Sequence, residues 1–546
     1  MYVSSLPQNA EFDYVVVGAG SSGCVMANRL SADGRHQVLL IEAGGRDNNI
    51  NIRIPVMVAK LLMDERVTWP FMTEPQTHLN GKPQLWVRGR VIGGSNAING
   101  LLFVRGDPAE YDKWREAGCA GWGYSDLLPY FKRLEDYPEG DPAVRGRGGP
   151  IGVTNLGHFD ELVDAFVDAC EQNGFKRLSD YNDGSYEGTF PLQYSTRNGF
   201  RSSSATAYLR PVRKRPNLTI LTNAPATHVL TEGKRASGVE VSCGGTLQQI
   251  RARREVVLSA GPLKSPQILE LSGIGNAEIL QKFGIGVVHH LPAVGENLRD
   301  HPNVRLTFEC AKPITINDVL RNPLLKVKEG LRFVFKRKGL LTICSATAQT
   351  NFRSSSEAKQ PDLVLRLLPV SGKDRYARTK RYGLDPFPGF TFGITPLQPH
   401  SVGTMHIRST DPHDQAAMDP RYLAHEADVQ LFLDGIRIGR RVAQQPALKP
   451  LIVRETRPGP DANDDAALLD YVRETVQTSW HMIGTCKMGV DDASVVDPEL
   501  RVRGVANLRV VDTSICPTIP SSNTNAAAIA IGEKGADLVL AAARAR

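Results

Sequence analysis

Residues 13–45 read DYVVVGAGSSGCVMANRLSADGRHQVLLIEAGG, and this stretch decides the fold. A run of β-branched residues leads into Gly18, Gly20 and Gly23, and the next segment carries apolar residues at helical spacing. A second apolar run then places Glu42 near its end. The stretch therefore predicts a strand, a glycine-rich turn, a helix and a second strand.

This order of elements is typical of a dinucleotide-binding unit. Gly18 permits the tight turn, Gly20 lets the backbone approach a pyrophosphate, and Gly23 lets the helix pack close to the strand. The helix N-terminus offers N–H groups to the phosphates, and Glu42 is placed to accept hydrogen bonds from the ribose. Because the chain has 50 glycines, the glycine pattern alone is weak evidence, and a turn without a cofactor role is the alternative. The flanking elements favour a dinucleotide and leave NAD or FAD open.

Length and composition limit the other possibilities. At 546 residues and 59.7 kDa the chain is longer than one hydrophobic core usually supports, so we expect two or more domains. The net charge of +7 is spread over 65 basic and 58 acidic residues, which does not indicate a nucleic-acid partner. The eight cysteines form no CxxC pair, so we expect reduced, mostly buried thiols, no dense disulfide framework and no metal site.

Membrane attachment is weakly indicated. The N-terminus lacks the features of a signal peptide and no run of about 18 apolar residues follows, so we expect no integral membrane segment and a cytoplasmic location. The basic stretch 321–339, RNPLLKVKEGLRFVFKRKG, could lie on an anionic membrane surface, although the solvated face of a docked helix is the favoured explanation. The basic loop 372–383 is either a substrate lid or, more simply, a surface loop.

Three further segments carry information. In 88–106, RGRVIGGSNAINGLLFVRG, the pair Gly93 and Gly94 suits a backbone that passes close to a flat or anionic ligand, with a bulge or turn as the alternative. Residues 255–275 predict another strand, turn and helix. Residues 218–243 alternate as antiparallel strands do, which allows Val229 to line an adenine slot.

The C-terminal segment gathers polar residues at element ends. His481 lies in a turn-rich stretch, Asp512 closes a buried strand pattern, and Asn523 and Asn525 precede an apolar helix. An isolated histidine is most often structural, but these neighbours raise the functional interpretation of His481.

Taken together, these motifs resemble those of the glucose-methanol-choline (GMC) oxidoreductases, the FAD-dependent alcohol oxidases and dehydrogenases. The chain is most similar to their choline dehydrogenase-like and alcohol dehydrogenase-like members. The motifs that carry the resemblance run along almost the whole chain: DYVVVGAGSSG, LLIEAGG, RGRVIGGSNAIN, GPLKSPQILELSGIG, VGENLRDH, HMIGTCKMG and VVDTSICPTIPSSNTNAA.

The resemblance implies an α/β fold and a division into domains. A Rossmann-like FAD-binding domain is expected from residues 1–160, 200–304 and 488–546. A substrate domain, built on an antiparallel sheet covered by helices, is expected from residues 161–199 and 305–487.

The resemblance also implies a set of site residues. His481 matches the family's base, Asn525 matches the amide or histidine that holds the substrate oxygen, and Asn523 is the second candidate for that role. The residues expected to bind FAD are Gly18, Gly20, Ser22, Gly23, Glu42, Ala43, Trp69, Arg90, Gly93, Gly94, Asn99, Val229, Asp512 and Asn525.

The implied chemistry is oxidation of a primary alcohol to the aldehyde, with hydride transfer to flavin N5 and oxygen or a quinone as the final acceptor. The hydroxyl proton must leave as well, so a base is needed within roughly 3 Å, and an imidazole with a pKa of about 6.5 suits this task. A non-redox flavin enzyme of the same fold, such as a lyase or photodecarboxylase, and a flavoprotein without turnover are the alternatives. Nothing in the sequence indicates an oligomeric state.

Two positions depart from the family pattern. Some members tether the flavin through a histidine, but this chain has Ile98 there, so we expect a noncovalent FAD. Asn96 stands where a small hydroxyl residue or glycine is more usual, and a modest change in the loop facing the flavin is expected.

Overall fold

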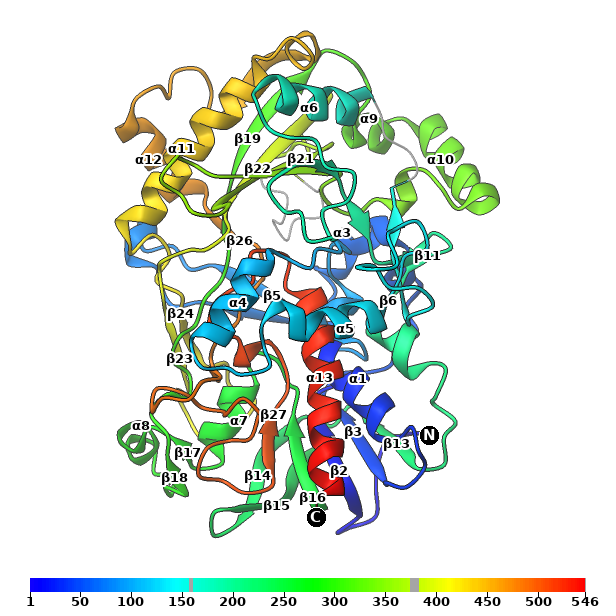
Figure 1. Ribbon diagram of the computed structural model, residues 1–546, viewed down its shortest axis with the longest axis vertical. Helices are drawn as coiled ribbons and strands as arrows, with labels where there is room; N and C mark the ends of the chain where they lie inside the picture. The colour runs from blue at the N-terminus through cyan, green and yellow to red at the C-terminus, as the bar shows by residue number, and fades with distance from the viewer. Residues whose placement is uncertain (157–160, 374–382, 546) are drawn as a thin grey trace.

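The computed structural model describes residues 1–156, 161–373 and 383–545. Two regions, each built around a large sheet, make up the molecule, one in the lower half of Figure 1 and one in the upper half. Most of the 372–383 loop lies outside the described residues, so the structure does not bear on a lid there.

The first sheet is eight-stranded and begins with the unit that the sequence predicts. Its strands run in the order β1-β13-β3-β2-β16-β15-β14, and β27 also pairs with β16. The pairs within β13-β3-β2-β16-β27 are parallel, whereas β14, β15 and β16 form an antiparallel meander. The strands are β1 (Tyr2–Val3), β2 (Glu11–Val17), β3 (Val38–Glu42), β13 (Leu218–Thr222), β14 (Ala226–Glu232), β15 (Arg235–Cys243), β16 (Thr246–Leu258) and β27 (Leu508–Val510).

The two ends of the chain meet on this sheet. Helix α1 (Ser21–Leu30) follows β2, and the C-terminal helix α13 (Asn525–Arg544) packs beside it (Figure 1). The contact is close because Gly532 has no side chain: a Cβ there would lie 2.9 Å from Ser22 Cα. Arg29 adds a bidentate ion pair with the buried Glu533, at 2.7 and 2.8 Å. The last helix is thereby fixed on the N-terminal unit.

The second sheet is seven-stranded and antiparallel. Its order is β25-β19-β22-β21-β20-β9, with β26 also paired to β19. Its strands are β9 (Gly188–Pro191), β19 (Pro302–Cys310), β20 (Ala348–Phe352), β21 (Leu363–Leu368), β22 (Gly389–Pro396), β25 (Ile452–Arg457) and β26 (Gln477–Thr478).

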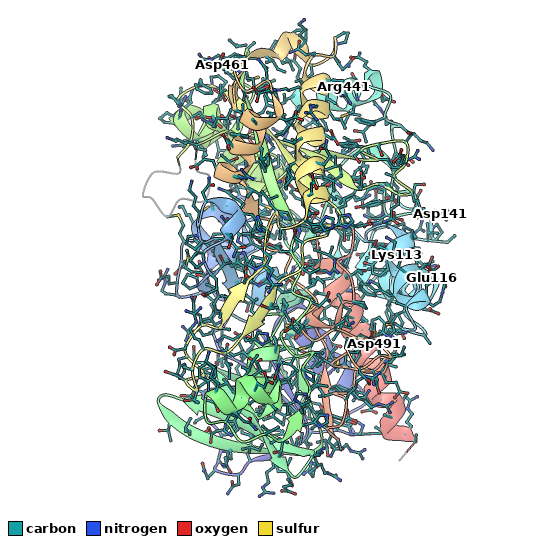
Figure 2. All side chains as sticks on the ribbon, turned by 90° about the vertical axis from the view of Figure 1, so that its left-hand side faces the viewer. Lys113, Glu116, Asp141, Arg441, Asp461 and Asp491 are labelled. Carbon is teal, nitrogen blue, oxygen red and sulfur yellow. The ribbon has the colours of Figure 1, made fainter. Side chains whose placement is uncertain are left out.

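Helices α6 (Glu161–Gln172), α11 (Glu426–Ala443) and α12 (Asp465–Thr475) cover the second region. Gly435 and Gly439 lie one turn apart on α11 and let it pack directly on the sheet, because a Cβ at Gly435 would lie 2.5 Å from Ile394. Charged side chains point outward: Arg441 and Asp461 lie at this end of the molecule in Figure 2.

The fold class is confirmed: a Rossmann-like α/β region and a helix-covered antiparallel sheet. The domain boundaries given above stay a prediction. Within the described part of the chain, no helix combines the length and the apolar character needed to cross a membrane.

Candidate active site

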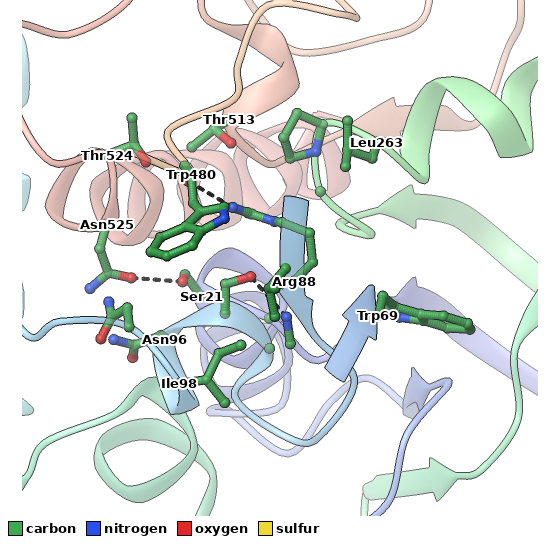
Figure 3. A pocket seen from close by; sticks show the side chains of 18 of the residues that line it. Ser21, Trp69, Arg88, Asn96, Ile98, Leu263, Trp480, Thr513, Thr524 and Asn525 are labelled. Carbon is green, nitrogen blue, oxygen red and sulfur yellow. Dashed lines mark hydrogen bonds between the residues drawn. The ribbon is translucent and has the colours of Figure 1, made fainter. Parts of the chain in front are cut away.

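A cavity lies between the two regions and brings together their functional side chains (Figure 3). Glu42 and the glycine turn after β2 line one wall, while Arg366 from β21 and His481 line the other. Parallel strands direct their carboxyl ends to one edge of a sheet, which is where α/β proteins bind ligands.

The glycine turn after β2 has the geometry that the sequence predicts. Gly18 has φ +98°, and its N–H donates to Ile41 O at 2.8 Å. A Cβ on Gly23 would lie 1.9 Å from Gly18 O, so only glycine lets α1 start this close to the strand. Gly20 is the N-cap of α1 and provides no side-chain cap, which leaves the first N–H groups of the helix available to a ligand.

Gly94 joins the second glycine segment to this turn. It has φ +53°, and a Cβ there would lie 2.7 Å from Gly20 Cα. The backbones of two segments more than seventy residues apart in sequence therefore touch at the cavity wall, as expected where a chain passes close to a flat or anionic ligand.

Two carboxylates lie on this wall. Glu42 accepts from the N–H groups of Ala19 (3.0 Å) and Gly44 (2.8 Å), and burial raises the pKa of its carboxyl to about 7. Asp512 accepts from the N–H of Gly261 at 2.9 Å and from Ser514 N at 2.8 Å. Each carboxylate thus orients a backbone turn and still faces the cavity.

Most of the residues expected to bind FAD line this cavity. They are Gly18, Gly20, Ser22, Glu42, Ala43, Trp69, Gly94, Asn99, Asp512 and Asn525. Gly23, Arg90, Gly93 and Val229 lie outside its described lining.

Two of the residues outside the lining have other partners. Val229 lies in β14, and its N–H donates to Ser272 Oγ at 2.7 Å. The residues 224–226, just before and at the start of that strand, line the cavity instead. The Arg90 guanidinium carbon lies 4.5 Å from the centre of the Trp69 ring, and Trp69 lines the cavity.

A carboxylate behind the wall holds His481 in place. Asp300 accepts from the His481 N–H at 2.7 Å, from Thr478 Oγ1 at 2.5 Å and from the hydroxyl of Tyr422. Trp480, just before the histidine, has φ +60°. These contacts fix the turn that points the imidazole into the cavity.

His301 fixes the tautomer of His481. A carbonyl only accepts, so His301 Nε2 donates to Leu397 O at 2.8 Å, and its Nδ1 is left as an acceptor. The 3.0 Å contact between the two Nδ1 atoms therefore requires His481 Nδ1 to donate. His481 Nε2 then carries the lone pair, and it accepts from Asn523 Nδ2 at 2.9 Å.

Both imidazoles are neutral. Burial lowers the pKa of His301 to about 3. Burial also lowers the pKa of His481 well below its ordinary value, and the nearby His301, Arg366 and Arg88 lower it further. A neutral imidazole that carries a lone pair and no proton on Nε2 is the form in which histidine acts as a base.

The two candidate asparagines occupy different places. Asn523 contacts His481, whereas Asn525 Oδ1 accepts from Ser21 Oγ at 2.8 Å, next to the start of α1 (Figure 3). The geometry favours the second candidate, Asn523, for the role that the sequence assigned first to Asn525. The two residues are only two positions apart, but the chain turns into α13 between them.

Sequence reasoning missed His301, Arg88 and Arg366. His301 ends the motif VGENLRDH, so its place in a motif was a usable signal. Arg88 likewise begins the motif RGRVIGGSNAIN, whereas Arg366 carried no signal, because a buried arginine cannot be told from a surface one by type alone.

The residues of the cavity fit FAD. The uncapped N-terminus of α1 and the Gly20–Gly94 contact suit a pyrophosphate. Asn96 also lines the cavity, and its buried Nδ2 has no hydrogen-bond partner among the described residues, so it can donate to a polar ring of the cofactor. The apolar Ile98 lies beside it in the same wall.

Comparisons with known proteins identify the family of the chain. The family model described as GMC oxidoreductase matches residues 12–303 with its N-terminal part and 399–532 with its C-terminal part. The chain is 40% identical over 537 residues to the oxygen-dependent choline dehydrogenase of Photobacterium profundum, covering 97% of this chain and 93% of that protein. The protein of the same name from Vibrio vulnificus is 39% identical, with 97% and 94% covered.

Solved structures give the same result. Pyridoxine 4-oxidase from Mesorbium loti superposes with a TM-score of 0.86 at 30% identity, covering 96% of this chain and 98% of that one. A formate oxidase variant from Aspergillus oryzae superposes with a TM-score of 0.92 at 25% identity, covering 99% and 100%.

The fold and the site together define an FAD-dependent oxidoreductase that acts on the CH–OH group of an alcohol donor. The chain belongs to the GMC oxidoreductase family, as its sequence motifs predicted.

Proposed function

We propose that the protein oxidises a primary alcohol to the aldehyde and that His481 is the base. The observation that carries the proposal is the tautomer: the lone pair of a buried, neutral imidazole is on Nε2, the nitrogen that Asn523 contacts at the cavity wall. FAD, when bound, supplies the acceptor for the hydrogen and two electrons that leave the carbinol carbon.

The chain's own residues do the remaining work. His481 Nε2 takes the hydroxyl proton, and the Nδ1–H bond to His301 steadies the imidazole as it becomes charged. The Asn523 amide, which contacts His481 Nε2 in the structure, donates to the substrate oxygen instead when the alcohol binds, and this leaves Nε2 to accept the hydroxyl proton. Asp300 accepts from the backbone N–H of His481 and so holds the imidazole at a fixed position relative to the substrate.

Residues on the first wall would hold the cofactor. The backbone at Gly18, Gly20 and Gly94 provides room and N–H groups for the pyrophosphate, and Glu42 provides a carboxylate for the ribose hydroxyls. Asp512 and Asn525 lie along the rest of the cavity.

We propose that FAD is bound without a covalent link. The position at which some members of the family carry a tethering histidine is Ile98 here, which is 2% exposed and has no nucleophilic atom. Acid precipitation should release all of the flavin into the supernatant. Flavin fluorescence that stayed with the denatured chain would contradict this.

The function is tested by its two half-reactions. Anaerobic mixing with a panel of primary alcohols should bleach the flavin absorbance, and oxygen or a soluble quinone should then restore it. The relatives' name, oxygen-dependent, supports oxygen as one acceptor. Purified protein that binds FAD but is reduced by none of the alcohols would refute the proposal.

A further inference from the structure

Arg366 places a buried positive charge in the cavity. It lies on β21, its side chain lines the cavity, and the residue is 8% exposed. Its Nε donates to Gln349 Oε1 at 3.1 Å, and its Nη2 lies 3.5 Å from Asn523 Oδ1. Both partners are neutral amides, and no carboxylate among the described residues forms an ion pair with it. Burial lowers the pKa of the guanidinium to about 10, as expected for a cation without a compensating charge.

This charge lies next to the base. The amide of Asn523 donates to His481 Nε2 at 2.9 Å and faces Arg366 with its oxygen, so a single amide group bridges the two side chains. His481 Nε2 and Arg366 Nη2 are therefore no more than about 9 Å apart. An alcohol bound with its hydroxyl at His481 has its other end within reach of the guanidinium.

The surroundings do not neutralise this end of the cavity. In its described lining the carboxylates are Glu42 and Asp512, and both are hydrogen-bonded to backbone turns of the first region. Asp300, behind His481, already accepts hydrogen bonds from three groups and is not in the lining.

We infer that the substrate is a primary alcohol that also carries a carboxylate, which Arg366 binds while His481 takes the hydroxyl proton. The inference rests on the proposed function. A guanidinium offers a planar fork that matches a carboxylate, and a buried cation of this kind lacks only its counter-ion. Choline, the alcohol in the names of the relatives, is a cation and would be repelled here.

A matched pair of alcohols tests the inference. 4-(Hydroxymethyl)benzoate and 4-(hydroxymethyl)benzamide have the same shape and differ in charge. The wild type should favour the acid by about 30-fold or more in kcat/KM. Arg366→Met should remove this preference, mainly through KM, and Arg366→Lys should keep part of it. Arg454→Met is the matched control, because Arg454 is exposed, pairs with Glu309 and lies outside the cavity lining.

A binding measurement gives a second readout. Titration of the flavin absorbance of the wild type should show that the non-oxidisable acid 4-methylbenzoate binds at least about tenfold more tightly than 4-methylbenzamide. Arg366→Met should abolish this difference in affinity. Equal affinity of the wild type for the two compounds would overturn the inference. This comparison uses the wild type alone, so it decides the question even where Arg366→Met fails to fold.

The outcomes separate this inference from the proposed function. If no alcohol of the panel reduces the flavin of the wild type, the proposed function fails. If other primary alcohols reduce it but 4-(hydroxymethyl)benzoate does not, only the carboxylate assignment fails. If both are oxidised but the acid is not preferred, or if Arg366→Met slows both equally, only the carboxylate assignment fails.

A second, independent feature is an apolar face on helix α10 (Pro323–Lys336). The sequence favoured a docked helix with a solvated polar face, yet apolar side chains are exposed: Leu324 78%, Val327 60%, Leu331 53%, Val334 56% and Phe335 79%. Only Phe333 on this helix is buried, with its ring edge-on to Phe200. Figure 1 shows α10 at the outer edge of the second region.

Basic residues surround this face. The exposed ones are Arg321, Lys326, Lys328, Lys336, Arg337 and Lys338. The acidic Glu329 is turned toward the protein, where it accepts from Leu340 N. An exposed apolar stripe flanked by cations matches the surface of an anionic bilayer, where the stripe enters the acyl boundary and the cations meet the headgroups.

We propose that α10 docks the protein on an anionic lipid surface. The chain runs from α10 through Leu340–Thr342 to Cys344, which lines the cavity, so the docked helix lies close in sequence to the active site.

Vesicle sedimentation tests this proposal. The holoenzyme should bind phosphatidylcholine vesicles that contain about 30% phosphatidylglycerol, should bind pure phosphatidylcholine vesicles several-fold less, and should be released by salt. Leu331→Glu should reduce binding about fivefold or more. Leu247→Glu is the control, because Leu247 is 54% exposed on β16 in the other region. Equal binding to both vesicles, no binding, or a dimer that Leu331→Glu dissociates would overturn it.

Discussion

The two walls of the cavity use different parts of the chain. The first wall is made mainly of backbone, at Gly18, Gly20 and Gly94, and at Gly18 and Gly94 there is no space for a side chain. The second wall is made of side chains, those of His481, Asn523 and others, which come from distant segments. A backbone wall binds a cofactor by shape and N–H groups, whereas a side-chain wall sets the chemistry and the substrate.

The difference determines how each wall tolerates change. Adding one carbon to the first wall forces backbone atoms apart, so folding and cofactor binding fail together. Removing a side chain from the second wall leaves the fold and the cavity intact but changes the reaction rate or the substrate preference.

The largest effect is expected for Gly94→Ala. The new Cβ would lie 2.7 Å from Gly20 Cα, and neither backbone can move freely. We expect loss of nearly all bound FAD, measured as the ratio of flavin to protein absorbance. Gly81→Ala is the control, since Gly81 also has positive φ (+73°) but nothing lies within 4 Å, and it should cost only about 1 kcal/mol of stability with FAD retained. Normal flavin content in Gly94→Ala would show that the close contact does not matter.

His481→Ala should leave FAD bound but slow flavin reduction by about 10²–10⁴-fold, the usual contribution of a general base. Stopped-flow reduction with a saturating alcohol measures it. A rate equal to that of the wild type would remove His481 as the base and weaken the distinction between the two walls.

A smaller effect should distinguish the two asparagines. Asn523→Ala removes the amide at His481 Nε2 and should slow reduction by about 10- to 100-fold. Asn525→Ala removes an acceptor for Ser21 and should act mainly on FAD affinity. The opposite pattern, with slow reduction only in Asn525→Ala, would restore the first assignment.

The smallest effect is a change in the pH dependence of stability. Unfolded histidine binds a proton below a pKa of about 6.5, whereas folded His301 does so only near 3, so protons favour the unfolded chain as the pH falls through this window. Between pH 7 and 5 this costs about 2 kcal/mol. His301→Gln should therefore lose about 2 kcal/mol less than the wild type between these pH values in urea unfolding.

Two other groups bear on this comparison. His301 helps to lower the pKa of His481, so its removal relieves part of that lowering and adds to the expected difference. Glu42, with its pKa raised to about 7, acts in the opposite direction, because the folded state takes up its proton first. It does so in both proteins, so its contribution cancels. An identical pH dependence in the two proteins would show that His301 is not buried as a neutral group.

The sequence predicted the turn after β2 well because that turn is local. The turn after β2 depends on glycines within a few positions of one another, and its conformation follows from the residues themselves. His481 and Ile98 were found through short motifs of the sequence, and in the structure both residues line the cavity.

Other features depended on which distant residues the fold brings together. Strand order and helix packing place His301 against His481, bring Arg366 to Asn523, and turn Asn525 toward Ser21. Residue type and spacing therefore determined a dinucleotide cleft with a histidine beside it. Only the tertiary structure decided the protonation of that histidine, its amide partner and the charge facing the substrate, because contacts between segments hundreds of residues apart are set by packing and not by local backbone preference.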